Sequence, residues 1–284
     1  MENKNEELMM RYKPKLKYTY PEKTDQHMIK VPHIVDTNFN KDYNYFDDSK
    51  KYHFKRFLMN VFLYTIGYHI ISIRHGLKIV GRDKLKKNKE LFKDGAITIC
   101  NHVFLWDYIC VMKAIRPQLE YHLAWPINFQ GGNRKLIKLV GGVPIPETRE
   151  GLIKFNHAIN DILEKKYWLH AFPEGSMWFY YPNIRPFKKG IFTYAHKFNR
   201  PVIPMAISFR KPKGIYKLLG VKNPQITLTI GDPELPNLNL SRMESIEELQ
   251  RRCYKKVQIL AGINENDPDY KTLTFEETQG YYEH

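Results

Sequence analysis

A histidine and an aspartate five residues apart, His102 and Asp107, could carry out proton transfer. Five residues turn a helix by about 140°, so the two side chains would not share a helical face. They can meet if His102 lies in a loop after a strand and Asp107 lies in the first turn of the next helix. A carboxylate bonded to one imidazole nitrogen leaves the other nitrogen to accept a proton. The pair is therefore a candidate general base, although Asp107 could instead complement a helix N-terminus.

A second candidate site is the segment 172–176 (FPEGS), a Pro-Gly turn with a carboxylate at its centre. Alternatively, this segment is an ordinary turn without a role in binding or catalysis. Ser176 is a poor nucleophile candidate, because no Gly-x-Ser-x-Gly pattern surrounds it. Two further blocks, 141–146 (GGVPIP) and 202–206 (VIPMA), lie before and after this segment.

The elements that must position these residues alternate along the chain from residue 77 onward. Strand-like apolar runs occur at 77–81, 96–101, 119–124, 167–172, 201–208 and 226–231. Helical spacing of apolar residues predicts helices at 149–166 and 241–260, and the segments 106–116, 133–140 and 188–198 between the strands are also expected to be helical. This alternation predicts an α/β domain with a mostly parallel sheet flanked by helices. Ligands of such sheets bind beyond the carboxyl ends of the strands, where both candidate sites follow a strand.

We divide the chain into four parts: a polar arm (1–54), a membrane-interface helix (55–76), the α/β domain (77–262) and an acidic tail (263–284). The arm should be extended or loosely packed, and the tail poorly ordered. The opening residues do not resemble a secretory signal. Residues 57–73 are apolar and free of charge but shorter than the roughly 20 residues of a spanning helix. Their basic flanks favour a helix in the interface of an anionic bilayer, with a buried core helix as the alternative.

The formal net charge of +15 comes from 45 Lys and Arg against 30 Asp and Glu. Residues 175–231 hold ten of the basic residues and no acidic residue. This favours an anionic partner: nucleic acid, a membrane surface, or an acidic substrate. A non-catalytic membrane-binding or nucleic-acid-binding protein is an alternative, but no nucleic-acid module accompanies the charge. The three cysteines suit a reducing compartment, and no metal-ligand spacing occurs, so we expect no metal site.

Taken in order, the blocks N-H-x4-D, GGVPIP, FPEGS followed by PFKKG, and VIPMA resemble the lysophospholipid acyltransferase family, which includes bacterial 1-acylglycerol-3-phosphate O-acyltransferases. The resemblance covers roughly residues 55–235. It implies a glycerol-phosphate acyltransferase-like fold and acyl transfer from a thioester to the free hydroxyl of 1-acylglycerol-3-phosphate. The product would be phosphatidate, in phospholipid biosynthesis. The implied partners are an anionic membrane surface, a lysophospholipid, and acyl-CoA or acyl carrier protein (acyl-ACP) as co-substrate, with no cofactor and no nucleic acid. The implied location is the cytoplasmic face of the cell membrane, peripheral or monotopic.

By this resemblance His102 is the general base, Asp107 orients it, and no acyl-enzyme forms. Fixed donors, usually backbone N–H groups, must stabilise the oxyanion. Glu174 and Gly175 would shape the acceptor site, with Ser176 beside them.

The chain departs from the family at two positions that often hold a phosphate-binding arginine, which are Met177 and Glu147 here. Neither side chain can replace the bidentate hydrogen bonds of arginine. We therefore expect the missing charge from four cations: Arg149, Arg185, Lys188 and Lys189. Otherwise the acceptor is a lyso-aminolipid or another lysophospholipid. The run 178–181 (WFYY) could contact an acceptor or the membrane interface, or could be an aromatic turn packed on the sheet.

Overall fold

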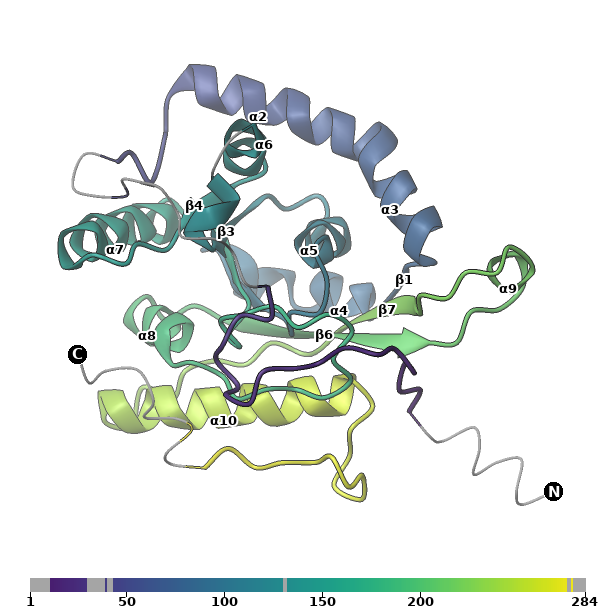
Figure 1. Ribbon diagram of the computed structural model, residues 1–284. Helices are drawn as coiled ribbons and strands as arrows, with labels where there is room; N and C mark the ends of the chain where they lie inside the picture. Colours follow the sequence, from purple (N-terminus) through teal and green to yellow (C-terminus); the bar gives the residue numbers. More distant parts are fainter. Residues whose placement is uncertain (1–10, 30–38, 40–42, 130–131, 275–276, 278–284) are drawn as a thin grey trace.

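The computed structural model describes residues 11–29, 39, 43–129, 132–274 and 277, and its centre is one twisted sheet (Figure 1). The seven strands lie in the order β1-β7-β6-β2-β5-β3-β4. All neighbouring strands are parallel except β6 and β7, so β1 and β7 run opposite to the rest. The predicted mostly parallel sheet is confirmed. The strands are β1 (Lys78–Val80), β2 (Ile97–Ile99), β3 (Glu120–Ala124), β4 (Gly142–Pro144), β5 (Trp168–Ala171), β6 (Val202–Arg210) and β7 (Gln225–Ile230).

Helices cover both faces of the sheet, which gives three layers (Figure 1). One face packs against α5 (Asp107–Ile115), α4 (Arg82–Lys87) and the long helix formed by α2 (Lys50–Phe62), a π-helical turn and α3 (Tyr68–His75). The other face packs against α7 (Arg149–Glu164), α8 (Gly190–Lys197) and α10 (Arg242–Leu260). Two short helices lie at the rim, α6 (Asn133–Leu139) beside β4 and α9 (Ile215–Leu218) at the tip of the β6–β7 hairpin.

The core strands are apolar on both faces because helices cover both sides. Every residue of β2 and β5 is buried and most are apolar, while the two polar residues, Thr98 and His170, are bonded to each other at 2.8 Å. Helix α10 begins as predicted: Ser241 accepts from the Glu244 N–H, and the Glu244 side chain accepts from the Ser241 N–H. The three cysteines are free and buried, and burial raises their thiol pKa values.

The described parts of the N-terminal arm pack against the α/β domain more closely than we predicted from the sequence. Phe39 and Tyr45 are buried in the core, and the Tyr45 hydroxyl donates to Phe39 O at 2.7 Å. Helix α2 begins at Lys50, before the predicted boundary at residue 55, because Ser49 caps it by accepting from the Tyr52 N–H. Aromatic residues scattered without a period contribute to the core here, so periodicity did not reveal them. Residues 1–10, 30–38 and 40–42 lie outside the described residues.

The acidic tail also packs where it is described, against the prediction of poor order. Ile263 and Leu273 are buried, and Gln258 on α10 bonds to both backbone groups of Lys271. Asp267 and Asp269 pair with Arg11 of the arm, so opposite charges join the two ends of the described chain. Residues 275–276 and 278–284 lie outside the described residues.

Candidate active site

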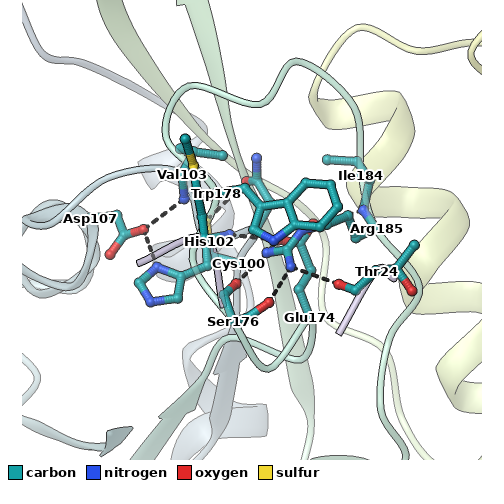
Figure 2. A network of polar contacts seen from close by, with 12 residues as sticks. Thr24, Cys100, His102, Val103, Asp107, Glu174, Ser176, Trp178, Ile184 and Arg185 are labelled. Carbon is teal, nitrogen blue, oxygen red and sulfur yellow. Dashed lines mark hydrogen bonds and ion pairs between the residues drawn. The ribbon is translucent and has the colours of Figure 1, made fainter. Parts of the chain in front are cut away.

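His102 and Asp107 meet at the carboxyl end of β2, in the arrangement that their spacing allowed. His102 lies in the loop after β2, and Asp107 is the first residue of α5. Their side chains are 2.6 Å apart, from Nδ1 of His102 to Oδ2 of Asp107 (Figure 2). The aspartate side chain is fully buried, whereas the histidine side chain is 24% exposed. The predicted pairing is confirmed, and it leaves Nε2 of His102 to accept a proton.

The carboxylate of Asp107 is held by the loop that it orients. Its Oδ2 atom also accepts from the backbone N–H groups of Val103 at 3.0 Å and Phe104 at 3.4 Å. The N–H of His102 donates to Glu174. These three backbone donors are therefore used by carboxylates, and an oxyanion must be stabilised by donors from elsewhere.

Phe172, the first residue of the FPEGS turn, supports the imidazole of His102. The two rings are stacked with centroids 4.1 Å apart and planes 9° apart. Because β2 and β5 are neighbours, the residue that follows β5 lies beside the loop that follows β2. No role was predicted for Phe172, and its position at the end of the predicted strand 167–172 was the available signal.

Glu174 and Arg185 form a buried ion pair behind the base (Figure 2). Nη2 of Arg185 donates to Oε2 of Glu174 at 2.8 Å, and the Arg185 backbone N–H donates to Oε1 at 2.8 Å. The His102 N–H donates to the same Oε2 at 3.0 Å. One carboxylate thus joins the loop of the base to the segment at residue 185, so Glu174 positions the site from behind.

Arg185 and Ser176 do not face a substrate, although both were predicted to bind one. Each is only 1% exposed. The guanidinium of Arg185 donates to the hydroxyl and carbonyl of Ser176 and, at 3.0 Å, to Thr24 O. The charge of Arg185 is balanced by Glu174, and the Ser176 hydroxyl is bonded to Arg185, so we assign neither residue to the acceptor.

Lys188 lies against the turn at Gly175. That glycine has a φ of +74°, and a Cβ there would come within 2.6 Å of the Lys188 Nζ atom. Glycine is therefore required both by the left-handed backbone and by the close approach of the lysine. Lys188 is half-buried, and burial lowers its pKa. Among the four predicted cations, it is the one that we retain for the acceptor.

The other two predicted cations are placed elsewhere. Lys189 is buried, and its Nζ atom bonds to Glu247 of α10 at 2.8 Å. Arg149 is exposed at the start of α7, which follows the edge strand β4. Spacing along the chain could not separate these roles, because the partner Glu247 lies far away in sequence.

The aromatic run 178–181 packs rather than lying open. Trp178 and Tyr180 are buried, and so is Met177, at the position where an arginine was expected. The rings of Tyr18 and Tyr20 stack over Phe179 and Trp178, at 5.8 and 5.5 Å between centroids. The interpretation of this run as a packed aromatic turn is therefore the one that the structure supports.

Two further histidines, His122 and His170, lie in the sheet behind the site. Both are buried, and burial lowers their pKa values, that of His122 to about 3. They are thus uncharged at neutral pH. Within the part of the chain that the structure describes, no group of three or more His, Cys, Asp or Glu side chains could hold a metal ion.

A mostly parallel α/β sheet with a buried aspartate bonded to a partly exposed histidine at a strand end has the geometry that general-base catalysis requires. The family model for acyltransferases matches residues 76–208, just under half of the chain and the part that holds both halves of this site. This match shows an acyltransferase domain, and the chain is an acyltransferase. The crystal structure of the 1-acyl-sn-glycerophosphate (LPA) acyltransferase PlsC from Thermotoga maritima is similar, with 21% sequence identity and a TM-score of 0.45. That match covers 65% of this chain and 71% of the other. No curated protein matches significantly.

Proposed function

We propose that this protein transfers a fatty acyl group from acyl-CoA or acyl-ACP to the free hydroxyl of 1-acylglycerol-3-phosphate, giving phosphatidate. The observation that carries the proposal is the His102–Asp107 pair, which lies inside the acyltransferase match with its carboxylate fully buried. A buried carboxylate that fixes the tautomer makes the exposed imidazole nitrogen a directed proton acceptor.

The reaction needs one base and no covalent intermediate. Nε2 of His102 takes the proton of the acceptor hydroxyl as its oxygen attacks the thioester carbonyl. The tetrahedral intermediate collapses, the carbon–sulfur bond breaks, and the departing sulfur takes the proton from the imidazolium. Asp107 stabilises the positive imidazolium between these two steps, because its carboxylate is bonded to Nδ1.

A second acceptor class is favoured by the residues at the two departures from the family pattern. Met177 is buried and uncharged, and Glu147 is exposed and acidic. Neither can bind a phosphate, so the same acyl transfer could serve a lyso-aminolipid or another lysophospholipid.

A panel of acceptors tests the proposed function. Purified full-length protein is given acyl-CoA or acyl-ACP with 1-acylglycerol-3-phosphate, lysophosphatidylethanolamine, lysophosphatidylglycerol or a lyso-ornithine lipid, and the products are identified by mass spectrometry. We expect phosphatidate to form fastest. Faster turnover of any other acceptor would show that this acceptor, and not lysophosphatidate, is the preferred substrate. Absence of product from every acceptor would reject acyl transfer onto lysolipids.

The basic segment 175–231 supports an anionic donor as well as an anionic membrane. Acyl-CoA carries phosphate groups and acyl-ACP is acidic, so positive charge near the site favours the encounter with either. Running the panel with both donors decides between them.

We propose that the helix Lys50–His75 attaches the protein to the cytoplasmic face of the membrane. It is long and apolar enough to cross a bilayer by length and composition alone, and 28% of its most apolar window is buried. Its inner face is bonded to the α/β domain: Arg56 donates to Glu120 O, and Tyr52 donates to Lys138 O at 2.8 Å. A helix fixed along one side to a polar domain cannot cross a bilayer, which supports a position in the interface. Its outer face is exposed and apolar, with Phe54, Phe57, Leu58, Val61, Phe62, Ile66, Ile70 and Ile73.

The tip of the β6–β7 hairpin extends this outer face. Leu218 and Leu219 are 81% and 70% exposed, and the hydroxyl of Tyr216 donates to Ile73 O on α3. Exposed lysines flank the tip, namely Lys211, Lys213, Lys217 and Lys222. Apolar side chains ringed by lysines suit an anionic bilayer, so we place this tip in the same interface.

The double substitution Phe57→Asp/Leu218→Asp should weaken binding to vesicles that contain anionic lipid. Each change removes an apolar side chain from the lipid and adds a negative charge, so we expect at least a tenfold fall in partitioning for the pair. Co-sedimentation with phosphatidylglycerol vesicles measures it. The control is Ile259→Asp, which changes an apolar residue that is 51% exposed on α10, on the other face of the sheet. Equal binding of the double variant and the control would contradict this placement.

A further inference from the structure

The N-terminal arm crosses the loops that form the candidate active site. Residues 11–21 have no regular secondary structure and residues 22–29 form bends and a turn, and this part of the arm passes across the front of the molecule (Figure 1, dark purple). At its described start Arg11 pairs with Asp267 and Asp269 of the tail. The arm lies outside residues 76–208, which match the acyltransferase family, so whatever it does is an addition to the common catalytic domain.

Three successive contacts hold residues 24–28 on the FPEGS turn and the segment after it. Thr24 O accepts from Arg185 at 3.0 Å, as Figure 2 shows. Gln26 O accepts from the indole N–H of Trp178 at 2.8 Å, and the Met28 sulfur accepts from the Phe179 N–H at 3.3 Å. Each partner belongs to the segment 174–185. The same segment is bonded to the loop of His102, through Glu174 and the Trp178 N–H. The arm is therefore bonded to the catalytic scaffold itself.

Within this segment His27 is stacked on Trp125. The ring centroids are 3.8 Å apart and the planes differ by 9°. Trp125 directly follows β3, the neighbour of β5, so the stacked pair lies at the same edge of the sheet as His102 and Glu174. His27 is half-buried there, although it is a polar residue in an arm without helix or strand. A ring held at such close distance has a defined orientation.

The electrostatic environment of His27 includes groups of the candidate site. Burial, followed by the influence of Lys188, His102 and Arg185, lowers the pKa of His27 to about 4, while Asp25 opposes the shift. The imidazole is thus neutral at pH 7, with an N–H group to donate. Lys188 is itself half-buried, and burial lowers its pKa, which Asp25 partly offsets. An anion bound beside these groups would favour the charged form of Lys188.

We propose that residues 24–28 form one side of the acceptor site and that His27, held on Trp125, donates a hydrogen bond to the anionic head group of the lysolipid beside Lys188. The inference rests on the proposed function, which it deepens by naming a specificity-determining residue. It also accounts for Met177: the space at this turn is covered by the arm, so the contact to the head group comes from the arm instead. The ligand chemistry is a phosphate monoester or a phosphodiester on a lysolipid.

The substitution His27→Phe tests the proposal, because phenylalanine keeps the stack on Trp125 and removes the N–H donor. With the acyl donor saturating, we expect the KM for 1-acylglycerol-3-phosphate to rise about tenfold, which is the typical effect of losing one hydrogen bond to a charged group. The kcat and the KM for the donor should stay within about twofold of the wild type. The preference over 1-acylglycerol, which lacks the phosphate, should fall by the same tenfold. His27→Gln, which keeps an N–H donor, should recover part of the loss.

The control is His157→Phe, a histidine exposed on α7, which should change none of these values. Thermal unfolding of each variant shows whether it is folded. An unchanged KM in folded His27→Phe protein, or an equal loss for both acceptors, would overturn the proposal. If the acceptor panel selects another anionic lysolipid, the same comparison is made with that lysolipid against 1-acylglycerol. The acceptor panel therefore tests the proposed acceptor, and the His27→Phe comparison separately tests the role of His27.

Discussion

Replacing His102 by alanine should lower kcat for acyl transfer by about three orders of magnitude, because general-base catalysis typically contributes a factor of 10²–10⁴. The side chain is partly exposed and the loop is held by its backbone contacts to Glu174 and Trp178, so the fold should survive the change. Product formation by purified protein, measured with labelled acyl-CoA, checks this prediction. Retention of vesicle binding by the same variant serves as the control for an intact protein.

Asp107→Asn gives a graded version of the same experiment. The amide keeps a similar shape but cannot stabilise an imidazolium, and it can reverse the preferred tautomer of His102. We expect a fall in kcat that approaches that of His102→Ala, and a double variant that is hardly worse than either single variant. Independent, multiplicative losses would show that the two residues do not act as a unit.

The second large effect is expected from Glu174→Gln, which leaves the buried guanidinium of Arg185 without its counter-charge. Removing one partner of a buried ion pair lowers the free energy of unfolding by about 3–5 kcal/mol, a large share of the stability of an ordinary domain. For a chain of this size that corresponds to a fall in Tm of about 10 °C. The loop of His102 also loses a charged acceptor for its backbone N–H, so kcat should fall in protein that remains folded.

Differential scanning calorimetry and activity at a temperature well below Tm measure the two consequences separately. The matched control is Glu265→Gln, which breaks the exposed pair with Lys255 and should leave Tm close to that of the wild type. A Glu174→Gln variant as stable as this control would show that the buried pair is not needed to hold the site.

The parts of the fold that local sequence dictates were predictable. Runs rich in apolar residues predicted six of the strands, because strands covered on both faces, such as β2 and β5, are mostly apolar. The capping residue Ser241 marked the start of α10, since capping depends on residues only three apart. The strand β4 was missed, because Gly142 and Pro144 are typical of turns. Its pairing with β3 at the edge of the sheet, where proline is tolerated, makes it a strand.

The packing of the two ends was not predictable from periodicity. Phe39 and Tyr45 reach the core from irregular chain, and Arg11 meets acidic residues from the opposite end of the sequence. Contacts of this kind depend on where the chain returns in space, so no window of sequence contains them.

The sequence by itself determined the pair that could carry the chemistry: a histidine and an aspartate, spaced so that a loop and a helix start bring them together, are a candidate general base. The tertiary structure decided where the predicted cations lie. Arg185 and Lys189 are bound to Glu174 and Glu247, and Lys188 lies against the turn at Gly175, where burial lowers its pKa and Asp25 of the arm partly offsets the shift. These positions depend on burial and on partners distant in sequence, which spacing along the chain does not specify.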